Sequence, residues 1–183
     1  ATSKENNAEL PFGQLFSSRR SIREYSSQPV TQDEIQRVVE LAMKTPSVCN
    51  RQSTRVYAIT NEATIEKALK LQGGFNGYAM PPVLFLITAD NSAFLWPNER
   101  NEGFTDGGLF SMSLLLSLEA NGLAACPLNT MMSDDIDKKT KALVGVPDSE
   151  FLVMYIAAGH FAAESKTCIS QRFPVDRILK IIK

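Results

Sequence analysis

The stretch DGGLFSMSLLLSLEANGLAACPL, residues 106–128, decides the fold class. From Leu109 to Leu118 it has almost no polar face, and the run ends at Gly122. A helix that is apolar nearly all round lies in a core or at a subunit interface. A short strand is predicted around AACPL directly after it. The stretch therefore predicts a buried helix beside a sheet.

The flanking segments alternate between helix and strand patterns. Thr31 and Glu34 have the capping-box form, and apolar residues follow at helical spacing until Pro46. Strands are predicted over residues 55–60, 81–89 and 151–159, and helices over ATIEKALKL, SDDIDKKTKAL and the terminal VDRILKIIK. The alternation predicts a layered sheet covered by helices, without deciding whether its strands are parallel.

Length and composition fit one ordinary globular domain. The chain has 183 residues, of which 44% are hydrophobic, and this is enough to bury a core. The polar opening predicts a flexible tail over residues 1–11, followed by a single domain over residues 12–183.

The charge balance limits the classes of partner. A net charge of -1 and a pI near 5.9 give no electrostatic footprint for nucleic acid or a membrane surface. We therefore expect neither partner. The three widely spaced cysteines and the lack of a signal-peptide pattern favour reduced thiols and a cytoplasmic location.

Conventional catalytic groups are scarce. His160 is the only histidine, and the cysteine spacings match no zinc pattern, so we expect no metal site. His160 follows a predicted strand and reads more simply as a hydrogen-bonding residue than as a general base. Cys49 and Cys126 stand among small residues, where a buried, inert thiol is the commoner explanation.

Two polar segments are not required by helix or strand patterning. RRSIREY, residues 19–25, offers guanidinium groups suited to a phosphate or a polarised carbonyl, or else it is a helix end that pairs with carboxylates such as Glu24. PSVCNRQ, residues 46–52, offers amides suited to a heterocycle edge, or else it is an ordinary loop that satisfies its own backbone.

Together and in this order, the two segments resemble the nitroreductase family of FMN-dependent oxidoreductases. That family has an R-R-S-x-R segment and then a helix that ends in A-P-S-x-x-N-x-Q, where this chain reads RRSIR and TPSVCNRQ. Further similar stretches are FNGYAMPPVLFLI, the 106–128 stretch itself, YIAAGH and SQRFPVDRIL. The resemblance covers roughly residues 12–183. It implies an α+β fold, a three-layer α/β/α sandwich with a mainly antiparallel mixed sheet, in an intertwined homodimer.

The resemblance also implies a cofactor site at the subunit interface. One subunit would place Arg19, Arg20, Ser21 and Arg172 at the FMN phosphate and ribityl chain, with Arg23 and Asn76 at the pyrimidine side and Pro127, Leu128 and Asn129 near N5 of the ring. The other subunit would contribute Pro46, Ser47 and Asn50. In this sequence Val48 and Cys49 replace small or hydroxyl residues common in the family, and Ser170 replaces a lysine sometimes found there.

The loop over residues 94–104, called the lid loop below, lies where the family varies its substrate lids. Phe94, Trp96 and Phe104 would cover the exposed face of the flavin, or else they anchor a surface loop or a dimer contact.

The implied activity is a two-step exchange in which NAD(P)H reduces FMN at N5 and an electron-poor acceptor, such as a nitroaromatic or a quinone, then takes the hydride. The cofactor carries this chemistry, so no catalytic side chain is expected. Two alternatives stay open. One is another FMN enzyme of the same fold, such as a dehalogenase or a flavin-fragmenting enzyme, and the other is a non-redox flavin-binding or structural homodimer.

Overall fold

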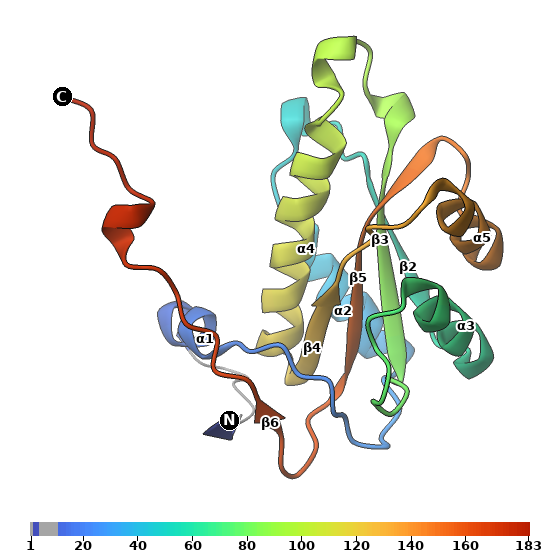
Figure 1. Cartoon of the computed structure of the whole chain (residues 1–183), viewed down its shortest axis with the longest axis vertical. Helices are drawn as coiled ribbons and strands as arrows, with labels where there is room; N and C mark the ends of the chain where they lie inside the picture. The colour runs from blue at the N-terminus through green and yellow to red at the C-terminus, as the bar shows by residue number, and fades with distance from the viewer. Residues whose placement is uncertain (1, 4–10) are drawn as a thin grey trace.

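A computed structural model describes residues 2–3 and 11–183, and its centre is a four-stranded sheet (Figure 1). The strands are β2 (Thr54–Ile59), β3 (Val83–Asp90), β4 (Leu123–Leu128) and β5 (Glu150–His160), in the order β2-β3-β5-β4. All three pairings between these strands are antiparallel. Among the described residues, the one parallel pairing is the isolated bridge between Ser21 and Ala125. The expected α+β class is confirmed, and the sheet is antiparallel at every strand pairing rather than mixed.

Helices cover both faces of the sheet. Figure 1 shows α2 (Gln32–Ala42) and α4 (Glu102–Ala120) on one face, and α3 (Glu62–Gln72) and α5 (Asp134–Val144) on the other. Side chains of β3 alternate between the two cores, since Val83, Phe85 and Ile87 face α4 while Leu84 and Leu86 face α3. A strand buried on both faces explains the unbroken apolar run VLFLI.

The helix predicted from the 106–128 stretch is α4, and it begins earlier, at Glu102. Phe110, Leu114 and Leu118 are buried against the sheet, whereas Leu109 on the outer side is 48% exposed. A Cβ added to Gly107 would lie 2.9 Å from the Val153 side chain. This glycine is therefore needed for close packing of the helix on β5.

The capping residues predicted for two other helices are confirmed. Thr31 caps α2 and forms a capping box with Glu34, and the side chain of Asn61 caps α3. A further short helix, α1 (Phe12–Ser18), was not expected from the sequence. Within the part of the chain that the structure describes, no helix combines the length and the apolar content needed to cross a membrane.

The C-terminal segment corrects one expectation. The predicted helix VDRILKIIK is wrong, because only Val175–Arg177 forms a single 3₁₀ turn there. Residues 171–183 are exposed and lead away from the sheet (Figure 1). They bury no amphipathic face against the other residues that the structure describes, and such packing is what stabilises a short helix.

The N-terminal tail falls mostly outside the described residues. Residues 1 and 4–10 are not described, so the flexible tail over 1–11 stays a prediction. The two described residues form β1 (Thr2–Ser3), which pairs antiparallel with β6 (Lys166–Thr167).

Candidate functional site

The arginine segment, residues 19–25, lies along the edge strand β4. Ser21 bridges to Ala125, and the backbone N–H of Ile22 donates to the Ala125 carbonyl at 2.9 Å. The Ile22 side chain is 1% exposed, and the hydroxyl of Tyr25 donates to the Ala157 carbonyl at 3.0 Å. Main-chain pairing and burial thus fix the segment, and the guanidinium of Arg20 adds hydrogen bonds to the Ser17 and Arg19 carbonyls at 2.7 and 2.8 Å.

Three guanidinium groups gather at the start of this segment. Nη1 of Arg19 is buried and has no hydrogen-bond partner among the described residues. Burial lowers the pKa of Arg19; Glu119 opposes this effect, and the like charges of Arg172 and Arg20 add to it. The three arginines repel one another, and one guanidinium nitrogen has no acceptor in the described part of the chain. This arrangement suits the binding of an anion.

Arg23 leads to a second group of residues beside the arginines. Its guanidinium lies 5.7 Å from the centroid of the Tyr78 ring, and Tyr78 packs on Phe75 at 5.3 Å. Asn76 lies between Phe75 and Tyr78 in the sequence, and its side chain donates to the Gly73 carbonyl at 3.0 Å. Asn76 and Arg23 are therefore held by the same turn.

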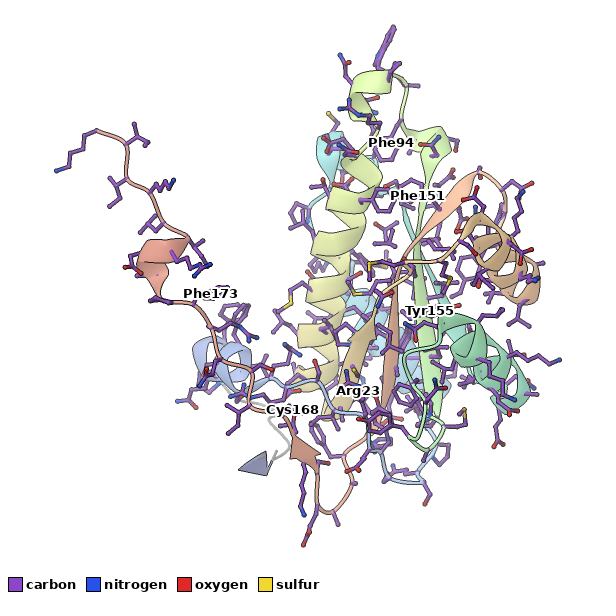
Figure 2. All side chains as sticks on the ribbon, viewed as in Figure 1. Arg23, Phe94, Phe151, Tyr155, Cys168 and Phe173 are labelled. Atoms are coloured by element: carbon purple, nitrogen blue, oxygen red, sulfur yellow. The ribbon has the colours of Figure 1, made fainter. Side chains whose placement is uncertain are left out.

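The segment 127–129 adjoins this turn. Nε2 of Gln72 donates to the carbonyl of Asn129 at 3.2 Å and so ties the end of α3 to the end of β4. Burial raises the pKa of the Cys126 thiol against the charges of Arg23 and Arg19, so this cysteine is no reactive thiolate. Through these contacts the arginine segment, Arg172, Asn76 and residues 127–129 form one region, which we call the arginine end. Figure 2 labels Arg23 within it.

The loop over residues 46–52, the 46–52 loop, has an unusual backbone. Cys49, Asn50 and Gln52 have φ angles of 48°, 55° and 51°, in the left-handed region that non-glycine residues rarely adopt. Two side chains hold this shape. The carboxylate of the buried Asp106 accepts the Val48 N–H at 3.1 and 3.2 Å, and Ser47 Oγ accepts the Gln52 N–H at 3.0 Å.

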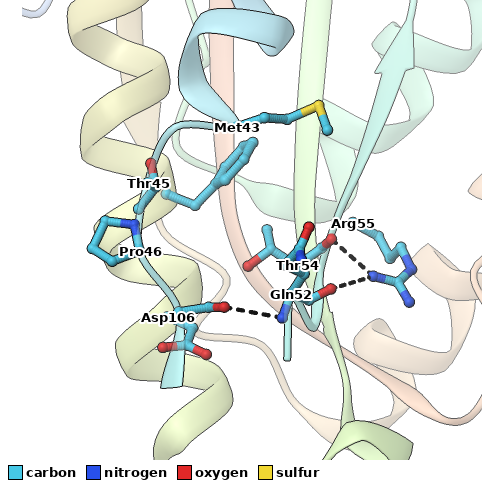
Figure 3. A pocket seen from close by; sticks show the side chains of 9 residues that line it. Met43, Thr45, Pro46, Gln52, Thr54, Arg55 and Asp106 are labelled. Atoms are coloured by element: carbon cyan, nitrogen blue, oxygen red, sulfur yellow. Dashed lines mark hydrogen bonds between the residues drawn. The ribbon is translucent and has the colours of Figure 1, made fainter. Parts of the chain in front are cut away.

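A cavity of about 190 Å³ lies beside this loop, between the end of α2 and the start of α4 (Figure 3). Pro46, Ser47 and Gln52 line one side, and Asp106 and Phe110 of α4 line another. The space gives a small ligand group access to the loop.

The lid loop stands at the same end of the molecule. Arg51 of the 46–52 loop pairs with Glu99 of the lid loop at 2.6 Å. Trp96 is 69% exposed, Phe94 is half-buried (Figure 2), and Phe104 lies in the first turn of α4, where its ring packs on Phe151 at 4.4 Å. We call the 46–52 loop and the lid loop together the loop end.

The two ends lie apart in one chain. The 46–52 loop is bound to Asp106 near the start of α4, whereas the arginine segment pairs with β4, which follows the end of α4. A helix of 19 residues is about 28 Å long at 1.5 Å per residue. The structure therefore brings together Arg19, Arg20, Ser21, Arg23, Asn76, residues 127–129 and Arg172, but not Pro46, Ser47 and Asn50 with them.

Sequence patterns did not single out four residues that support these ends. Tyr78 lies under the guanidinium of Arg23, and Gln72 donates to the Asn129 carbonyl. Asp106 accepts the Val48 N–H, and Arg51 pairs with Glu99. Asp106 could have been found from the sequence, because a carboxylate at the start of a helix predicted to be buried needs a hydrogen-bond donor. No group of three or more His, Cys, Asp or Glu residues in the described ranges could hold a metal ion.

Comparisons with known proteins agree with the fold and the motifs. Residues 16–77 match the model of the nitroreductase family. A Bacillus subtilis FMN reductase (NAD(P)H) is 24% identical over 82% of the chain, which spans 66% of that enzyme, and a Thermus thermophilus NADH dehydrogenase is 25% identical over 88% of the chain and 91% of its own length. The solved structure of Bacillus megaterium NfrA1 superposes with a TM-score of 0.82, at 19% identity, over 93% of this chain and 73% of that one.

Proposed function

We propose that the chain is a member of the nitroreductase family and an FMN-dependent NAD(P)H oxidoreductase acting on an electron-poor acceptor of the nitroaromatic or quinone type. FMN, when bound, would supply the exchange of hydride at its N5 atom, from NAD(P)H in one step and to the acceptor in the next. The protein's own part is to bind, orient and shield that cofactor, without a nucleophile.

The unpartnered Nη1 of Arg19 carries this proposal. A buried guanidinium nitrogen without an acceptor is costly, and a phosphate oxygen would supply the acceptor. Arg20 and Arg172 bring two more positive charges to the same place, which a dianionic phosphate would neutralise. The residues present therefore fit the phosphate end of FMN.

The remainder of the arginine end suits the ring of the cofactor. Arg23, held over Tyr78, would place a fixed positive charge at the pyrimidine edge and so favour the electron-rich, reduced ring. Asn76 would donate a hydrogen bond on the same side, and the backbone of residues 127–129 would face the ring. Because these groups are set by β4 and α3, they are oriented before the ligand arrives.

We propose that a homodimer completes the site, with the arginine end of one subunit facing the loop end of its partner. The separation of the two ends along α4 supports this arrangement. Exposed apolar side chains on the outer side of the helices, such as Phe12, Leu41 and Leu109, offer a surface for a second copy, as do Ile181 and Ile182 near the C-terminus. The cytoplasmic location stays a prediction.

An absorbance spectrum of the purified protein, recorded without oxygen before and after addition of NADH or NADPH, tests the redox proposal. A flavin band that bleaches supports it. A flavin band that persists favours the non-redox binding protein, and no band after reconstitution with FMN overturns the cofactor assignment.

Subunit complementation tests the shared site. Arg172→Ala and Asn50→Gly would each weaken one half, and glycine keeps the left-handed backbone at residue 50. A heterodimer of the two variants has one site with both changes and one with neither. Recovery of tight FMN binding in the mixture supports the interface site, and a site within one chain predicts no recovery.

A further inference from the structure

Arg51 connects the loop that would contact FMN to the loop that would cover it. Its Nη1 lies 2.6 Å from Oε1 of Glu99 and donates to the Ala93 carbonyl at 3.1 Å. The two charged side chains are only 23% and 18% exposed. Arg51 thus contacts the chain at both the beginning and the end of the segment that carries Trp96.

Glu99 gathers the rest of that segment. Its second oxygen, Oε2, accepts the N–H groups of Leu95 and Trp96 at 2.7 and 3.0 Å. One carboxylate therefore fixes the backbone on which the Trp96 side chain stands and also receives Arg51. An exposed ion pair alone contributes little, but this pair is half-buried and belongs to a network of four contacts.

The backbone of the 46–52 loop directs Arg51 toward the lid loop. Arg51 lies between Asn50 and Gln52, which both have left-handed backbone angles. Such conformations are costly for non-glycine residues and persist where surrounding contacts enforce them, often at functional sites. The side chains of Asp106 and Ser47, which accept the N–H groups of Val48 and Gln52, supply that enforcement here.

We propose that Arg51 is a positioning residue that fastens the lid loop to the 46–52 loop, so that binding of FMN and placement of Trp96 are coupled. We call the contacts of Arg51 with Glu99 and Ala93 the latch. The latch rests on observed contacts, whereas its link to FMN rests on the proposed function. Because coupling between two sites acts in both directions, a change that makes the lid loop more mobile also weakens the binding of FMN by the 46–52 loop.

Trp96 reports on the latch directly, because it is the only tryptophan of the chain. The full-length FMN-free protein and its Arg51→Gln variant are compared by time-resolved anisotropy of tryptophan emission. We expect the amplitude of fast local motion to about double in the variant, since the lid backbone loses its tie. We also expect the dissociation constant for FMN to rise about fivefold, at the lower end of ordinary coupling between sites.

Three further variants make the result specific. Arg51→Lys keeps the charge and should restore part of both effects, and Glu99→Gln should reproduce them from the other side of the pair. Lys70→Gln breaks an ion pair of similar length, 2.7 Å to Glu66 on α3, and should change neither quantity. Far-UV circular dichroism confirms that each variant is folded.

The possible outcomes separate the two proposals. Unchanged Trp96 motion in Arg51→Gln overturns the latch, and freer motion with unaltered FMN affinity overturns the coupling. A wild-type protein that binds no FMN overturns the proposed function, while the anisotropy of the FMN-free proteins still decides whether the latch exists.

Discussion

The arginine end and the loop end are held in place by different kinds of contact. The arginine segment is fixed by its main chain, through the Ser21–Ala125 bridge, and by the burial of Ile22. The 46–52 loop is fixed by side chains, chiefly Asp106 and Ser47. Main-chain pairing tolerates most substitutions, whereas a loop held by a few side chains changes when one of them changes. The loop end is therefore the half in which a single mutation can alter the site.

Asp106→Ala should show this contrast most strongly. The substitution leaves the Val48 N–H without its acceptor and removes a contact that holds the loop, so we expect the free energy of unfolding to fall by about 2 kcal/mol. Urea denaturation of the FMN-free protein measures this change, and an FMN titration should show weaker binding.

Asp106→Asn is the matched control, because the amide keeps one acceptor oxygen at nearly the same size. It should recover most of the stability. Equal losses in both variants would mean that the charge of Asp106, rather than its hydrogen bond to the loop, matters to the fold.

The same contrast separates what the sequence could predict from what it could not. The capping box of Thr31, the buried helix and the two polar segments follow from local patterns, and the structure confirms the first two. The left-handed angles of Cys49 and Gln52 have no such signal, because glycine and asparagine are the usual markers of that conformation. Nor could the contact of Val48 with Asp106, 58 residues away, be read from periodicity.

At the arginine end, side chains should matter to the ligand more than to the fold. Arg172→Ala removes a positive charge next to Arg19 from an exposed segment. We expect the dissociation constant for FMN to rise about tenfold, as for the loss of a charge-assisted hydrogen bond, with an unchanged urea midpoint. Isothermal titration calorimetry measures the affinity.

Arg177→Ala provides the control from the same segment. Arg177 stacks on Phe173 at 4.2 Å and has no predicted contact with FMN. Its loss should leave the affinity as it is. If both substitutions weaken binding alike, the effect comes from the net charge of the segment, and the assignment of Arg172 to the phosphate is wrong.

A pair of serines compares the two ends with the same chemical change. Ser47→Ala deletes the acceptor of the Gln52 N–H and should cost about 1 kcal/mol of unfolding free energy. Ser21→Ala leaves the main-chain bridge to Ala125 intact and should stay within about 0.5 kcal/mol of the wild type. Thermal unfolding of the FMN-free variants provides the comparison, and equal costs would remove the distinction between the ends.

Acid should loosen the lid loop before it disturbs the arginine end, and this is the smallest effect we expect. The N–H of Leu95 lowers the pKa of Glu99; partial burial opposes this, and the N–H of Trp96 and the charge of Arg51 add to it. A carboxyl whose pKa is lowered by folding stabilises the fold above its ordinary range, and that stabilisation is lost as the pH falls through the lowered value. The fast motion of Trp96 should therefore stay constant down to about pH 5 and increase only below about pH 4. In Glu99→Gln the same motion should be independent of pH. A change in the wild type near neutral pH would mean that a group other than Glu99 keeps the lid loop in place.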